Sequence, residues 1–277
     1  RHNITRVHIS LPEEHAYVFR VSFPHDAEGD VGQAIEFHLK ENVPFTIDQV
    51  TFDYELIGVT AQEVIAQVVV YPIAMATVYY DVFTEAGYVL SSAELHGKSI
   101  ARACLRGGND TTTILLLDSG PAAVVTVHGG IVHSSTVLDV PSNLFFADLC
   151  QTFQLSAADA TKLLRTTGVT LDTTDQAVHV REIADRYVEA LMEKIAYWKV
   201  QAIGATGEEE PARILLAGRY AGVRGFAEYI AAHVEMPVRV ANAWSNVTFD
   251  TPLPISYHDA LQFAAPIGLA LRDFTER

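Results

Sequence analysis

Two strongly apolar runs, far apart in the chain, each end in a turn that contains glycine. Leu115–Leu117 is followed by Asp118–Gly120, and Leu215–Ala217 is followed by Gly218. Glycine lets a backbone approach a ligand closely, and the N–H groups of such turns can hold phosphate oxygens. The acid can position a hydrated Mg²⁺. The alternative is an ordinary hairpin turn and an ordinary strand–helix connection, because Asp and Gly favour turns anywhere.

Composition restricts the class of protein. The chain has 277 residues, 49% of them hydrophobic, which suits one large or two modest folded domains. A formal net charge of -15 and the absence of any basic run exclude a nucleic-acid partner. Direct docking on an anionic membrane is disfavoured for the same reason. Two cysteines make no disulfide framework, which fits a reducing cytoplasm.

Several catalytic motifs are missing from the sequence. There is no Gly-x-Ser-x-Gly, no Gly-x-Gly-x-x-Gly and no phosphate-binding loop ending in Lys-Ser/Thr. Neither His-Glu-x-x-His nor Cys-x-x-Cys occurs, so a zinc site is not expected. The most apolar stretch, residues 64–80, is shorter than the ~20 residues that a membrane helix needs.

Hydrophobic periodicity predicts a mixed α/β chain with an inserted α+β piece. His128-Gly129-Gly130 predicts a tight hairpin between two strands. Strands are expected at 7–11, 17–21, 50–56, 63–71, 91–95, 112–117, 122–127, 131–136, 213–217 and 237–240. Helices are expected at 30–41, 74–86, 99–105, 144–153, 156–165, 179–201, 223–233 and 257–273.

Taken in order, these features resemble the PilM family of actin-like proteins, which is related to FtsA. The resemblance covers nearly the whole chain, and its most distinctive string is the closing Ala264–Arg272. The other matching segments are Asn42–Phe45, Val50–Tyr54, Asp81–Leu90, Leu117–Gly120 as the second phosphate loop, Ala157–Lys162 as the acid-to-lysine helix, and Leu215–Gly225 as the adenosine motif.

The resemblance implies an actin-like ATPase (ribonuclease H-like) fold with an inserted α+β subdomain called 1C. The family begins with a first phosphate loop that no residue here supplies, so we expect an N-terminally truncated chain. The implied divisions are 1–26 as the remainder of subdomain 1A, 27–96 as subdomain 1C, 97–140 as strands of 1A with the second phosphate loop, 141–256 as subdomain 2 with the adenosine motif, and 257–277 as the closing helix.

The nucleotide motifs depart from the family pattern. Ala217 stands where the first of two adjacent glycines is usual, Arg219 stands where a small residue is common, and Val124 replaces a usual Thr or Ser. ATP with Mg²⁺ is therefore expected to bind loosely or not at all, with no efficient hydrolysis and no catalytic residue assigned. The implied nucleotide-binding residues are Asp118 (also the metal candidate), Ser119, Gly120, Lys162, Ala217, Gly218, Arg219 and Gly225.

The resemblance implies a cytoplasmic scaffold of the type IV pilus assembly platform, held at the inner membrane only through partners. Its partners would be other pilus components and the cytoplasmic tail of a PilN-like membrane protein, lying between subdomains 1A and 1C. Two alternatives stay open: an active ATPase of the actin and sugar-kinase group, and the cytoplasmic domain of a GspL-like type II secretion protein. The implied tail-binding residues are Val43, Pro44, Phe45, Phe52 and Tyr54.

Overall fold

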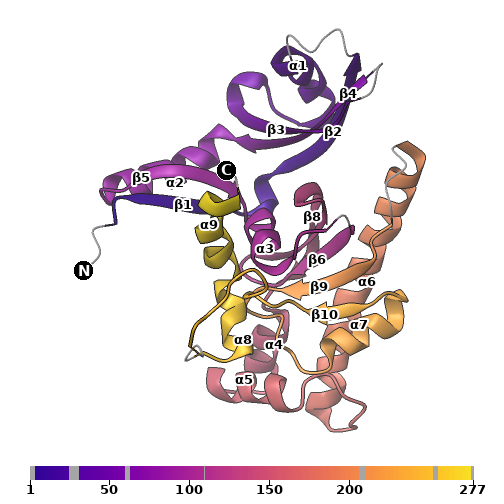
Figure 1. Ribbon diagram of the computed structural model, residues 1–277. Helices are drawn as coiled ribbons and strands as arrows, with labels where there is room; N and C mark the ends of the chain where they lie inside the picture. The colour runs from indigo at the N-terminus through magenta and orange to yellow at the C-terminus, as the bar shows by residue number, and fades with distance from the viewer. Residues whose placement is uncertain are drawn as a thin grey trace.

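The computed structural model describes residues 4–24, 31–59, 63–108, 110–205, 210–251 and 255–275. A five-stranded sheet forms the centre of the main body (Figure 1), in the order β10-β9-β6-β7-β8. Its strands are β6 (Thr112–Leu116), β7 (Pro121–His128), β8 (Ile131–Pro141), β9 (Arg213–Ala217) and β10 (Val238–Val240).

The strand directions follow from the connections. β7 pairs antiparallel with both β6 and β8, and Gly129–Gly130 makes the predicted hairpin turn between β7 and β8. β9 runs parallel to β6 after a long helical crossover, as parallel neighbours require. Parallel alignment places the carboxyl ends of β6 and β9 at the same edge of the sheet.

Both faces of this sheet are covered, which explains why its strands are apolar throughout. Leu115 and Leu216 face a core built with α4 (Leu144–Thr152), α5 (Ala157–Thr166), α6 (Asp175–Ala205) and α7 (Phe226–Val234). Ile114 and Leu215 face the other side, where α3 (His96–Cys104) and α9 (Ala264–Thr275) pack. Ser156 caps α5, since its Oγ accepts the Asp159 N–H at 3.1 Å.

The predicted closing helix is divided into three pieces. They are α8 (Tyr257–Ala260), a 3₁₀ turn at Leu261–Phe263, and α9. Pro266 lies in the first turn of α9, where its missing N–H leaves no hydrogen bond unmade. Gly268 lets α9 pack directly on α3, because a Cβ there would overlap the Ser99 carbonyl.

Two smaller layers extend from the body. β1 (Arg6–Leu11) pairs in parallel with β5 (Val89–Leu95), and α2 (Ile73–Glu85) packs on them. The second layer is the sheet β2-β4-β3, whose strands are β2 (Tyr17–Pro24), β3 (Val50–Val59) and β4 (Glu63–Pro72). It stands away from the body in Figure 1.

The β2-β4-β3 sheet encloses its own core with α1 (Val31–Asn42). Ile35 and Leu39 of α1 are buried against Val68 and Val70 of β4. Because β2 pairs with β4 along its whole length, a unit boundary at residue 26 would separate β2 from its sheet. No helix among the described residues is both long and apolar enough to cross a membrane.

Candidate functional site

The two glycine turns lie side by side at the carboxyl ends of β6 and β9. Leu117 N–H donates to the Ala217 carbonyl at 2.8 Å, and Tyr220 N–H donates to the Leu117 carbonyl at 2.8 Å. Gly218 has φ +100°, and a Cβ there would lie 2.7 Å from the Leu117 carbonyl. The two turns touch as neighbouring ends of one sheet.

Asp118, the predicted metal-positioning acid, is engaged by two neighbours. His96 Nε2, at the start of α3, lies 2.9 Å from Asp118 Oδ2. Asp118 Oδ1 accepts the Arg219 N–H at 3.4 Å. The opposite ring nitrogen of His96, Nδ1, lies 3.0 Å from Ser10 Oγ at the end of β1. The carboxylate is therefore held in place before any ligand arrives.

A buried acid completes this cluster. Glu13, in the short 3₁₀ turn Glu13–His15, accepts the Gly97 N–H at 2.7 Å. Burial raises the pKa of Glu13 to about 6 in spite of that hydrogen bond and of the nearby His96. Burial lowers the pKa of His96, but the hydrogen bond to Asp118 and the charge of Glu13 outweigh it, so the net shift is upward.

Two pockets meet at Arg219 and Tyr220. The first is open, has a volume of 660 Å³, and is lined by the Asp118–Gly120 turn together with β8. The second, of 340 Å³, is lined by Phe145, Phe146 and His258 among others. The turn could hold anionic oxygens, and the aromatic pocket could hold a flat ring.

No group of three or more His, Cys, Asp or Glu side chains suited to a metal ion occurs within the described ranges. Mg²⁺ needs only one or two carboxylates when a ligand's phosphates and water complete its shell. Asp118 could supply one such oxygen if its hydrogen bond with His96 were broken.

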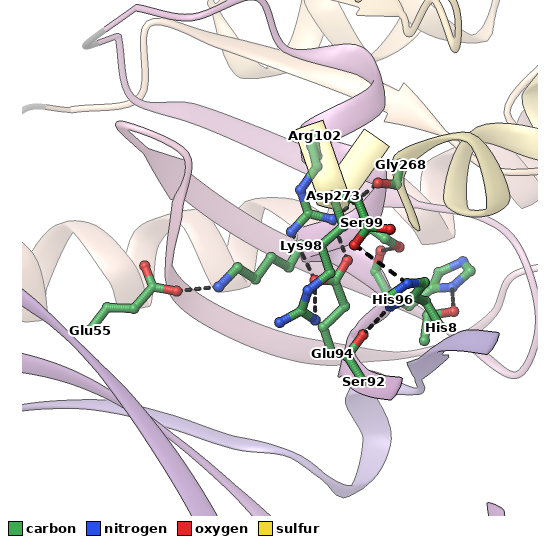
Figure 2. Close-up of polar contacts among 12 residues, drawn as sticks. His8, Glu55, Ser92, Glu94, His96, Lys98, Ser99, Arg102, Gly268 and Asp273 are labelled. Atoms are coloured by element: carbon green, nitrogen blue, oxygen red, sulfur yellow. Dashed lines mark hydrogen bonds and ion pairs between the residues drawn. The ribbon is translucent and has the colours of Figure 1, made fainter. Parts of the chain in front are cut away.

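A separate groove lies between the β2-β4-β3 sheet and the body. It has a volume of 90 Å³ and combines apolar walls with charged rims. Lys98 reaches from α3 to form an ion pair with Glu55 of β3 (Figure 2). Glu94 is bound by Arg102 through two hydrogen bonds of 2.5 and 2.8 Å. The residues that line it are Asp53, Tyr54, Glu55, Gln67, Val69, Ala93, Glu94, Leu95, Lys98, Ile131, Val132 and Arg272.

Gln67 at the groove carries an unsatisfied acceptor. The residue is only 2% exposed, and its Nε2 donates to the carbonyls of Phe19 and His133 at 3.1 and 3.2 Å. These two bonds fix the amide orientation, since a flip would oppose oxygen to oxygen. Its Oε1 is buried and has no hydrogen-bond partner among the described residues. Buried polar atoms are normally hydrogen-bonded, so this oxygen could accept a hydrogen bond from a bound ligand.

Known structures identify the fold. A scan of protein-family models finds no match to this sequence, and no curated protein matches it. Among solved structures, a chain of a PilM-PilN type IV pilus biogenesis complex superposes with a TM-score of 0.73 at 17% identity, over 98% of this chain and 80% of that one. The chain has the actin-like fold of PilM.

MreB5 of Spiroplasma citri supports the actin-like fold. The AMPPNP-bound form gives a TM-score of 0.51 at 13% identity, over 95% of this chain and 89% of that one. The ADP-bound form gives 0.50 at 14% identity, over 73% and 66%. The predicted actin-like α/β fold is thus confirmed, and the truncation and the subdomain divisions stay predictions.

Within this PilM-like fold, four predicted nucleotide residues, Lys162, Ala217, Gly218 and Gly225, do not line the two pockets. Lys162 is exposed and lines neither pocket; its helix neighbours Thr161 and Arg165 line the second. Gly225 has φ +73°, and a Cβ there would overlap the Val169 carbonyl, so packing explains this glycine. Ala217 is fully buried at the end of β9. Asp118, Ser119, Gly120, Gly218 and Arg219 are brought together at the carboxyl ends of β6 and β9.

Of the predicted tail-binding residues, one lines the groove and the others do not. Val43, Phe45 and Phe52 pack in the core between α1 and its sheet, and Pro44 is exposed. Tyr54, which is 38% exposed, lines the groove. Sequence reasoning missed Gln67, whose signal is a polar residue inside an otherwise apolar strand.

Proposed function

We propose that this chain is an actin-like scaffold of the type IV pilus assembly machinery, and that its groove binds the cytoplasmic tail of a PilN-like membrane protein. One observation carries the proposal: a partly apolar groove with an unsatisfied acceptor lies beside Tyr54 in a chain with a PilM-like fold. The matched PilM structure is itself a complex with PilN.

The groove suits an extended peptide. Val69, Leu95 and Ile131 offer apolar contact, and Asp53–Glu55 belong to β3, which pairs only with β4 among the described strands. An extended segment can add main-chain hydrogen bonds along such an edge while its side chains enter pockets. Gln67 Oε1 would accept one N–H of that segment.

This proposal places the chain in the cytoplasm, held at the inner membrane through its partner together with other pilus components. A net charge of -15 opposes direct contact with an anionic membrane surface. An intermediary with its own membrane anchor would supply the attachment.

Nucleotide binding is a second proposal. ATP would place its phosphates on the Asp118–Gly120 turn and its base in the aromatic pocket, with Arg219 between them. Its Mg²⁺ would have to compete with His96 for Asp118. We therefore expect loose binding and no efficient hydrolysis, because phosphoryl transfer depends on tight positioning by metal and loops.

The tail-binding proposal is tested with a synthetic peptide of the PilN-like cytoplasmic tail from the same organism, titrated calorimetrically. Replacing Tyr54 by Ala should cost about 2 kcal/mol, or roughly thirtyfold in affinity, as for a central interface aromatic. Phe37 provides the matched control, because it is an exposed aromatic on α1 that does not line the groove. Absence of binding to the unmodified chain, or equal losses in Y54A and F37A, would contradict the proposal.

A further inference from the structure

A second open pocket is rich in positive charge, although the molecule as a whole is negative. The chain has 19 Lys and Arg residues against 34 Asp and Glu residues. One pocket of 850 Å³ nevertheless gathers four cations and two acids. The charged residues around it are Lys98, Arg102, Arg106, Arg213, Glu55 and Asp110.

Two of the four cations are neutralised within the fold. Lys98 forms an ion pair with Glu55, and Arg102 is bound by Glu94 through both terminal nitrogens. These pairs hold the wall of the pocket in place and leave little charge for a ligand.

Among the described residues, the other two cations have only neutral partners. Arg106 Nε donates to the Ser245 carbonyl at 3.4 Å, and Arg213 Nε donates to Thr112 Oγ1 at 3.1 Å. Neither has a carboxylate within 4.0 Å in the described part of the chain. Within the described residues, the terminal N–H groups of both guanidinium groups make no hydrogen bond. That arrangement suits carboxylates, which Arg can bind with two parallel hydrogen bonds.

The pocket is remote from the glycine turns. Thr112 and Arg213 are the first, paired residues of β6 and β9, whereas Asp118 and Gly218 follow the opposite ends of these strands. The approach is open, because Gly107, Gly108, Gly129 and Gly130 form its rim without side chains. The pocket adjoins the groove of the previous subsection, with which it shares Glu55, Lys98 and Ile131.

We propose that this pocket binds an acidic segment of a partner protein, with carboxylates on Arg106 and Arg213. A volume of 850 Å³ is far larger than a single ion needs and lies near the upper end of small-ligand pockets. A long nucleic acid would meet the surrounding negative surface, while a short acidic segment touches only the pocket. This inference is independent of the PilN-like tail.

The test uses ¹⁵N-labelled chain titrated with a short poly-glutamate peptide at low salt, read by the well-separated glycine amide resonances. Shifts are expected at Gly107, Gly108, Gly129 and Gly130, and none at Gly87 or Gly168, which lie elsewhere in the fold. Salt should weaken the binding, because the contacts are charge pairs near the surface.

Variants separate a specific site from general attraction. Replacing both Arg106 and Arg213 by Gln should weaken binding by about tenfold or more, and exposed Arg106 alone should account for part of that loss. The matched control is Arg239→Gln, which removes an exposed charge on β10 outside the pocket. Equal losses in the control, unchanged binding in the double variant, or tighter binding of a single-stranded oligonucleotide at the same glycines would overturn the proposal.

Discussion

His96 Nε2 lies 2.9 Å from Asp118 Oδ2, and this contact joins the start of α3 to the turn after β6. Both side chains are mostly buried, with 20% and 22% of their surface exposed. A hydrogen bond between a carboxylate and an imidazole in such surroundings favours the charged imidazolium. The contact therefore ties the protonation of His96 to the availability of Asp118 for a ligand.

Replacing Asp118 by Asn should lower the pKa of His96. Burial already pulls that pKa down, and the hydrogen bond to Asp118 is the strongest influence that raises it. The measurement is an NMR titration of the imidazole resonances. Asp148→Asn serves as the control, because Asp148 pairs with a different imidazole, that of His179. An unchanged His96 pKa in D118N would show that the contact does not form in solution.

Glu13→Gln should remove a pH-dependent loss of stability. The pKa of Glu13 is raised from 4.5 to about 6 in the folded chain, and His96 and Tyr71 are the titratable groups acting nearby. Between these pH values the folded chain holds a proton that the unfolded chain has released. Its free energy of unfolding therefore falls as the pH rises, by about 2 kcal/mol in all.

Urea unfolding measures this effect as a difference between the variant and the unmodified chain. The advantage of E13Q should grow from below pH 4.5 to above pH 6, because the variant has no proton to lose there. A constant difference across that range would mean that Glu13 titrates normally in the folded state.

Gly218→Ala should destabilise the chain by about 2 to 3 kcal/mol, because the residue combines φ +100° with backbone contact to Leu117. Gly107 offers a control, since no atom lies within 4 Å of a Cβ there and its φ is not positive. Gly107→Ala should change the free energy of unfolding by less than about 0.5 kcal/mol. Similar losses for both variants would show that the turns are not held together as described.

The sequence predicted the elements of the fold well, because their signals are local. The apolar run ending at Leu117 and the Gly129–Gly130 turn each specify a strand or turn without distant help. The cap at Ser156 is local in the same sense. The actin-like arrangement was predicted from the family resemblance, because local sequence patterns do not specify which strands pair.

The sites were predicted less fully, because they are assembled from distant residues. The spacing of His96 and Asp118 in the sequence does not predict their contact. The cationic pocket brings together Arg106 and Arg213, which are more than a hundred residues apart in the sequence. Phe52 was predicted as a tail-binding residue, and the structure places it half-buried against the core between α1 and its sheet. Tertiary packing decides each of these cases.

The central claim is that the groove between the β2-β4-β3 sheet and the body holds the tail of a PilN-like protein. A crystal structure of this chain with the tail peptide tests it most directly. We predict peptide density between Tyr54 and Leu95, with a peptide N–H within hydrogen-bond distance of Gln67 Oε1. An empty groove with the peptide bound at another surface would contradict the account.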